Sequence, residues 1–230
     1  MDKSSSKNNM GLIIIVLIIG LLIGFGITKA MDSSSKKNLQ NQLSMVNQPT
    51  SSSKASDLRA NLVTLGVAHM MLTNQAVNAA LDGSSDASAT AASLYANGNS
   101  IGAAVGSVYG QSAQQTFDQV WKLHLDQFVA YAVASSKNDT AGKTAALNTI
   151  STGYTKPLAQ YLAKANPNID EGQLEAALAD HVSMTAQIID DHVHGNYTQE
   201  ATDLTAANTH IAGIFSILAG SIVKQYPTKF

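Results

Sequence analysis

Apolar residues recur three and four positions apart from about residue 57 to the end of the chain, a spacing that places them on one face of a helix. The pattern also repeats along the chain. Three segments carry two apolar residues and a histidine at positions i, i+3 and i+7: Leu62, Leu65 and His69; Phe117, Val120 and His124; Leu174, Ala177 and His181. Each unit closes with two apolar residues four apart and then a Gly or Pro breaker: Ile101, Val105 and Gly110; Leu158, Leu162 and Pro167; Leu218, Ile222 and Pro227. The sequence therefore predicts three copies of one helical unit.

Each unit divides into two helices at a short turn, where Gly83, Asn138 and Gly195 suit the left-handed residue that ends a helix. The six expected helices cover residues 57–81, 86–109, 112–137, 140–165, 170–194 and 198–225. Short connections make consecutive helices antiparallel neighbours. We therefore predict an all-α fold, a six-helix bundle built from three antiparallel hairpins at residues 57–110, 112–167 and 170–227.

The first 56 residues follow a different pattern. After a short tail at residues 1–10, an uncharged apolar run covers residues 11–28 and reaches about 27 Å as a helix, close to the hydrocarbon thickness of a bilayer. We expect a transmembrane signal-anchor in contact with membrane lipid, with a cleaved signal peptide as the alternative. Gly20 and Gly24 form a GxxxG pair that suits pairing of two anchors in a homo-oligomer. Residues 29–56, rich in Ser, Asn and Gln, are typical of a flexible tether.

This organisation predicts a single-pass protein of the cell membrane whose domain at residues 57–230 is extracytoplasmic. Composition narrows its function further. Charged residues make up only 13% of the chain and form no basic patch, which excludes a nucleic-acid partner. The chain has no Cys, so disulfides and thiolate metal sites are excluded as well.

The repeated histidines stand at one height in the predicted bundle. His69, His124 and His181 each precede a turn residue by fourteen positions, and His210 follows Gly195 by fifteen positions on the returning helix. All four would then lie about 21 Å from the turns. Neutral imidazole is a common metal ligand, and the core of a helical bundle is a usual place for a metal site. We therefore predict that these four histidines form a buried layer that binds a transition metal.

Copper is the preferred metal, because thioether near imidazole suits Cu(I) and Met184 lies three residues after His181. Tyr131 lies two turns after His124, so Tyr131 and Met184 are predicted as further cofactor-binding residues. Haem b held by two histidines is the second choice of cofactor. The expected function is metal capture or electron handling at the cell surface. Enzymatic activity stays open, since an oxidase or peroxidase would need an open coordination position.

An alternative from another class stands beside this prediction. A buried histidine that hydrogen-bonds to a carbonyl or a hydroxyl is an ordinary structural device. The chain would then be a structural or protein-interaction surface module without a cofactor. The segment DDHVH at residues 190–194 is expected to be a solvated helix end, with a metal site at the surface as its alternative.

Three segments carry a resemblance to a known family: LRANLVTLGVAHMML, SIGAAVGSVYGQSAQQTFDQVWKLHLDQFVAYAV and IVKQYPTKF. Residues 57–230 resemble a helical repeat domain of Gram-positive surface proteins that are often labelled copper amine oxidase-like because of a separate stalk domain. That stalk domain is absent from this sequence. The resemblance implies an extracytoplasmic helical module with histidines on the first helix of each hairpin, and it does not imply amine oxidation.

Overall fold

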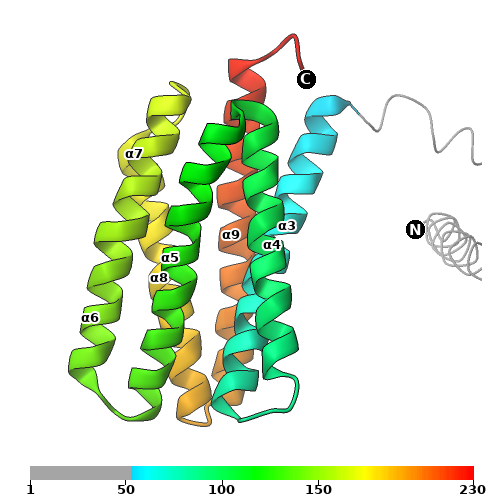
Figure 1. Ribbon diagram of the computed structural model, residues 1–230. Coiled ribbons are helices and arrows are strands. Elements are labelled where there is room, and N and C mark those ends of the chain that lie inside the picture. Colours follow the sequence, from blue (N-terminus) through cyan, green and yellow to red (C-terminus); the bar gives the residue numbers. More distant parts are fainter. Residues whose placement is uncertain (1–52) are drawn as a thin grey trace, which may run out of the picture. The chain divides into compact units, whose positions relative to one another are not determined.

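The computed structural model describes residues 53–230, which form an all-α bundle of six antiparallel helical rods (Figure 1). The rods are α3 (Lys54–Leu81), α4 (Ala87–Tyr109), α5 (Gln111–Ser136), α6 (Thr140–Ile150) with its continuation, α8 (Glu171–Val193) and α9 (Tyr197–Gln225). The predicted fold class and all six helices are confirmed, within a few residues at each end. The expected anchor at residues 11–28 and most of the tether at residues 29–56 lie outside the described residues.

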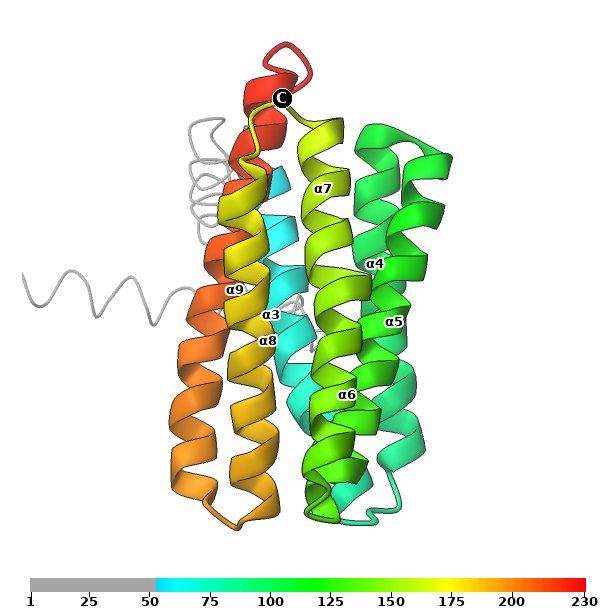
Figure 2. The ribbon, with the colours of Figure 1, turned by 90° about the vertical axis from the view of Figure 1, so that its left-hand side faces the viewer.

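The six rods of residues 53–230 form a closed ring. Each helix contacts the next one along the chain, and α9 packs back along α3. The first helices of the three hairpins, α3, α5 and α8, also contact one another across the inside of the ring. They run in the same direction, from the upper end of the bundle in Figure 1 to the turns at its lower end, and Figure 2 shows the same arrangement from the side. Equal positions in the three repeats therefore meet at equal heights in the interior.

The turns at the lower end have the chemistry that the sequence predicts. Gly83, Asn138 and Gly195 adopt φ values of 64°, 55° and 73°, in the left-handed region. Two helices, α6 and α8, are capped at their N-termini by an aspartate side chain. Asp139 accepts a hydrogen bond from the backbone N–H of Gly142, and Asp170 accepts one from that of Gln173. The three hairpins thus share one turn geometry, which fixes the register of their helices.

The first helix begins three residues earlier than predicted. Ser53 and Ser56 form a capping box, in which each side chain accepts a hydrogen bond from the backbone N–H of the other. The predicted boundary followed the apolar pattern, which starts later. Residues 54–56, assigned to the tether from the sequence, belong to the first turn of α3.

The helix predicted at residues 140–165 is interrupted in its middle. A π-helical turn, η1 (Ser151–Thr155), joins α6 to α7 (Lys156–Ala165). Pro157 stands in the first turn of α7 and has no backbone N–H, so the carbonyl of Gly153 loses its α-helical partner. A wider turn accommodates this loss by adding a residue, and such turns are frequent at functional sites. In this protein η1 places Tyr154 and Thr155 in the interior.

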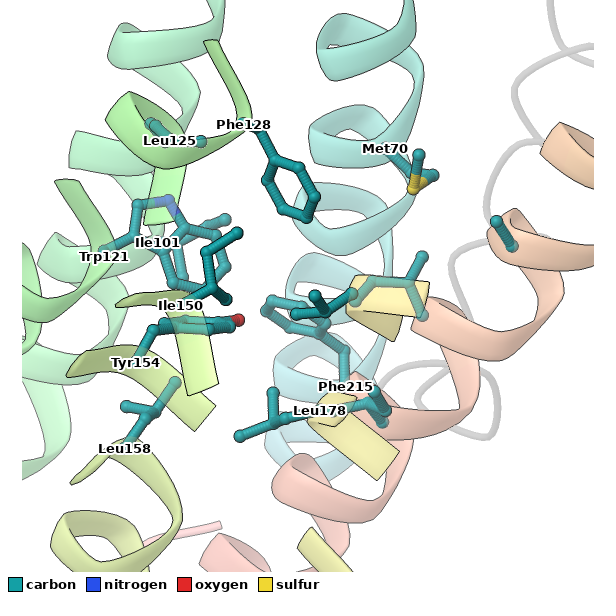
Figure 3. Close-up of a cluster of buried hydrophobic side chains, with 14 of the residues drawn as sticks. Met70, Ile101, Trp121, Leu125, Phe128, Ile150, Tyr154, Leu158, Leu178 and Phe215 are labelled. Atoms are coloured by element: carbon teal, nitrogen blue, oxygen red, sulfur yellow. The ribbon is translucent and has the colours of Figure 1, made fainter. Parts of the chain in front are cut away.

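One continuous apolar core fills the bundle. Figure 3 shows part of it, where Met70, Ile101 and Phe215 approach from three different helices. Within residues 53–230, the length and apolar composition of α9 would be sufficient for it to cross a membrane. A core helix meets the same criteria, and α9 buries Ile211 and Phe215 against its neighbours. We therefore assign α9 to the bundle.

Candidate functional site

Three of the four predicted histidines meet inside the bundle. His69 on α3, His124 on α5 and His181 on α8 are each at most 1% exposed. The ring centroid of His69 lies 5.5 Å from that of His124 and 6.0 Å from that of His181. The three side chains come from the three inner helices, so the equal register of the repeats is what brings them together. We call them the histidine cluster.

Two aromatic side chains enclose the histidine cluster on one side. Tyr154 from η1 stacks on His124, with ring centroids 4.1 Å apart and planes 20° apart. The indole of Trp121 lies 4.6 Å from the ring of His124 and 4.8 Å from that of His69. Gly98 on α4 makes room for the indole, because a Cβ there would lie 3.0 Å from it. The sequence pattern singled out neither residue for the site: it indicated a core position for Trp121, three residues before His124, and gave no signal for Tyr154 because the π-turn that turns it inward was not predicted.

Four imidazole nitrogens of the histidine cluster have no hydrogen-bond partner within the described part of the chain. They are Nδ1 of His69, both ring nitrogens of His124, and Nδ1 of His181. Burying a polar atom without a partner costs about 1–3 kcal/mol. Such atoms are rare in folded proteins, and an ion or water is a common reason for them. The cluster therefore has unused capacity to bind a ligand.

Burial keeps the three rings neutral. Together with repulsion from a neighbouring ring, His181 for His69 and His210 for His181, burial lowers the pKa of His69 to about 3 and that of His181 to about 4. Burial and the neighbouring rings also hold the pKa of His124 well below its ordinary value. The backbone carbonyl of Trp121 opposes this lowering of the pKa, but it lies outside hydrogen-bond geometry and so leaves both ring nitrogens unpaired. Neutral imidazole is the form that binds metals. At neutral pH no proton competes for these nitrogens.

His210 lies near enough to His181 to influence its pKa, but its own ring is engaged elsewhere. It is partly buried on α9, and its Nε2 lies 2.9 Å from the backbone carbonyl of Ala177 on α8. That contact gives His210 the ordinary structural role of a satisfied histidine. The sequence predicted that His210 lies at the same height in the bundle as the other three histidines. Its ring is instead engaged by a backbone carbonyl of the neighbouring helix α8.

The two predicted accessory residues also have other surroundings. The hydroxyl of Tyr131 donates a hydrogen bond to Asp190, 2.9 Å away, and Lys143 donates to the same carboxylate. Met184 is partly buried and packs against the apolar core. The fully buried thioether is instead Met70, whose Sδ lies 3.9 Å from the hydroxyl of Thr185.

The ring of His69 lies close enough to the rings of His124 and His181 to share an ion with either of them. A metal–imidazole bond of about 2.0 Å places the centroids of two rings on one ion about 5–6 Å apart. The separations of 5.5 Å and 6.0 Å fall in that range. Within residues 53–230, however, no group of three His, Asp or Glu side chains is placed so that it could hold an ion. Binding of one ion by all three rings would require these side chains to move, and for nitrogens without a partner such a movement breaks no hydrogen bond.

A second polar cluster lies at the hairpin end, and it corrects a prediction. Asp191 and His192 are buried, 4% and 9% exposed, and so do not form a solvated helix end. Nδ1 of His192 lies 3.0 Å from Glu200, and its Nε2 lies 3.0 Å from Asp82. The amide of Asn78 donates to the other oxygen of Glu200. Asn78, Asp82, His192 and Glu200, the hairpin-end cluster, join α3, α8 and α9.

No protein-family model, curated protein or solved structure matches the chain. The site is therefore interpreted from its own geometry.

Proposed function

We propose that the protein binds a transition-metal ion through His69, His124 and His181, for metal capture or electron handling. One observation carries the proposal: four nitrogens of three adjacent buried imidazoles have no hydrogen-bond partner. A purely structural histidine would be expected to have one, as His210 does. An ion bound by three imidazoles would satisfy one nitrogen of each ring.

Copper is the first choice of ion. Sites built of nitrogen ligands bind Cu²⁺ more tightly than other divalent first-row metals. The lowered pKa values of His69 and His181 keep these two rings unprotonated, and so able to bind a metal, down to about pH 3 and about pH 4, respectively. Neither Tyr131 nor Met184 is needed for this proposal. A role for Met184 would require its thioether to turn toward His181.

Haem is the weaker choice because the interior leaves little room for it. The cavity beside Trp121 and Tyr154 has a volume of about 50 Å³. Clefts that hold organic ligands are larger, about 300–1,000 Å³. A porphyrin would have to separate the helices, whereas a single ion takes up far less volume.

The single tryptophan makes the proposal directly testable. Cu²⁺ added to the full chain should quench the fluorescence of Trp121, because the indole contacts the rings of both His69 and His124. The melting temperature should rise at the same time, since a ligand that binds only the native state stabilises it. Zn²⁺ should raise the melting temperature with little quenching, which separates binding from quenching.

The variant pair His69→Leu with His181→Leu removes two ligands and keeps the apolar packing. It should abolish both responses to copper. His194→Gln is the matched control, because His194 is exposed and lies outside the histidine cluster. Quenching and stabilisation that persist in the double variant, or that are absent from the natural protein, would show that the histidine cluster is not a metal site.

The membrane anchor at residues 11–28 is proposed from the sequence alone, as is its pairing through Gly20 and Gly24. With the bundle outside the cytoplasm, the metal site would act at the cell surface, which agrees with the resemblance to Gram-positive surface proteins. Recovery of the full chain in the membrane fraction after alkaline washing supports the anchor. Recovery in the supernatant would contradict it.

A protein-interaction module is the second candidate. Val129 and Val133 are 54% and 46% exposed beside an apolar groove of about 340 Å³ between α3, α4 and α5. Exposed apolar patches of this kind are typical of binding surfaces. This candidate becomes the preferred one if the metal titrations leave both Trp121 fluorescence and melting temperature unchanged.

A further inference from the structure

An apolar cavity lies next to the histidine cluster on the side of the upper end of the bundle. Its volume is about 50 Å³. Its walls come from every rod of the ring and consist almost wholly of aliphatic and aromatic side chains, among them Leu62, Ile101, Phe117, Trp121, Tyr154 and Phe215. Figure 3 shows Ile101, Trp121, Tyr154 and Phe215 from this wall, with the hydroxyl of Tyr154 directed toward the middle of the bundle.

The wall offers little to a water molecule. A buried water needs two to four polar partners, and a cavity lined by aliphatic and aromatic side chains stays dry. The hydroxyl of Tyr109 is already engaged, because it donates to Gln225 and accepts from Asn166. Two other polar groups of the wall residues have no hydrogen bond in residues 53–230, the hydroxyl of Tyr154 and Nε1 of Trp121. Nε1 of Trp121 lies against Gly98 on α4, which is not part of the wall. The hydroxyl of Tyr154 alone does not provide the two to four polar partners of a buried water, so the almost wholly apolar wall favours a nonpolar occupant.

The volume limits the size of that occupant. An apolar cavity of about 150 Å³ accommodates benzene or xenon. The cavity here is about a third of that volume, which excludes a ring compound and leaves a molecule of one to a few heavy atoms. Dioxygen and xenon are of this size and are nonpolar.

The cavity is one aromatic ring away from the imidazoles. Trp121 and Tyr154 line it, and the same two side chains contact the ring of His124. We propose that this cavity is a binding site for a small nonpolar gas molecule, of the size of dioxygen, held beside the histidine cluster. The site is independent of metal binding, because its wall includes none of the three histidines.

Xenon and dioxygen probe the cavity in the full chain without any metal. Xenon should bind under pressure, seen as a saturable shift of the ¹²⁹Xe resonance and as perturbed methyl signals of wall residues such as Ile101 and Leu62. Dissolved dioxygen should quench the fluorescence of Trp121, while iodide should not, because the indole is buried and its cavity apolar.

A matched pair of variants assigns these responses to the cavity. Ala104 faces the cavity on α4, and Ala104→Leu adds more volume than the cavity provides, so it should abolish xenon binding and lower quenching by dioxygen. Ala103→Leu adds the same atoms on the exposed face of α4 and should leave both responses intact. The proposal is overturned if the natural protein shows no saturable xenon shift, if both variants bind xenon equally, or if iodide quenches Trp121 as well as dioxygen does. If Ala104→Leu does not fold, the xenon titration of the natural protein decides alone.

Discussion

Tyr154 stacks on His124 with ring centroids 4.1 Å apart and planes 20° apart, so a residue from the π-turn of one hairpin covers one imidazole of the histidine cluster. The contact gives a structural role to η1, the π-turn that interrupts the helix between α6 and α7. A regular α-helix through residues 151–155 would turn Tyr154 by a different angle around the helix axis. The π-turn therefore belongs to the construction of the site.

Two substitutions of Tyr154 should distinguish the contribution of its ring to stability from that of its hydroxyl. Tyr154→Ala removes a fully buried ring and should cost about 3–5 kcal/mol of unfolding free energy. Tyr154→Phe keeps the stacked ring and removes a hydroxyl without a hydrogen bond, so it should change stability by less than about 1 kcal/mol. Urea denaturation measures both. A large loss in Tyr154→Phe would mean that the hydroxyl makes an essential hydrogen bond.

The close approach of α3 and α9 depends on Gly66, one turn before His69. A Cβ at this position would lie 2.4 Å from the ring of Phe215, so Gly66→Ala should destabilise the protein by about 1–3 kcal/mol. Gly213→Ala is the control on α9, where an added Cβ meets nothing within 4 Å. That change should stabilise the helix by about 0.5–1 kcal/mol. Equal effects of the two changes in thermal unfolding would contradict this packing.

Acid should unfold the protein through the histidine cluster. The pKa values of His69 and His181 fall from 6.5 when unfolded to about 3 and about 4 when folded. Below pH 6.5 these two histidines are therefore protonated in the unfolded chain but remain neutral in the folded protein until the pH approaches their lowered pKa values. Stability from these groups is complete above pH 6.5 and is lost as the pH falls toward 4, by about 1.4 kcal/mol per pH unit for each ring. The double variant His69→Leu, His181→Leu should show a much shallower decline in urea unfolding between pH 6.5 and pH 4. An unchanged decline would place the acid sensitivity elsewhere.

His192 should give the opposite pH dependence. Burial by itself would lower its pKa, but its hydrogen bonds with Asp82 and Glu200 outweigh burial and raise the pKa above 6.5. The stability that this group adds is complete below pH 6.5 and is lost as the pH rises through the folded-state pKa. His192→Gln should remove that loss, while the exposed His194→Gln should not. An NMR titration of the His192 ring that gives a pKa below 6.5 would refute the assignment.

The fold was predictable because the repeats specify it redundantly. The i, i+3, i+7 pattern placed the inner face of each first helix, and Gly83, Asn138 and Gly195 marked the turns by their need for a positive φ. Both signals are local in the sequence. Equal distances from those turns were enough to place His69, His124 and His181 at one height.

The rest of the site depends on contacts between distant residues, which the sequence does not show. The ring of His210 turns to a carbonyl on the neighbouring helix. The burial of His192 follows from its pairing with Glu200 across a turn, and the charge pattern alone favoured a solvated end. The π-turn arises at Pro157, but Pro in a helical segment predicts only an interruption and does not predict its kind.

The closure of the ring by α3 and α9 has a consequence for how the chain is connected. Because the two helices are antiparallel neighbours, Ser53 and Phe230 leave the bundle at the same end. A short linker between them would complete a cycle of three equivalent hairpins, and the chain could then be opened at Gly110 instead. Such a circular permutant would retain every helix contact of residues 53–230. The bundle therefore does not depend on the order in which the three hairpins follow one another along the chain.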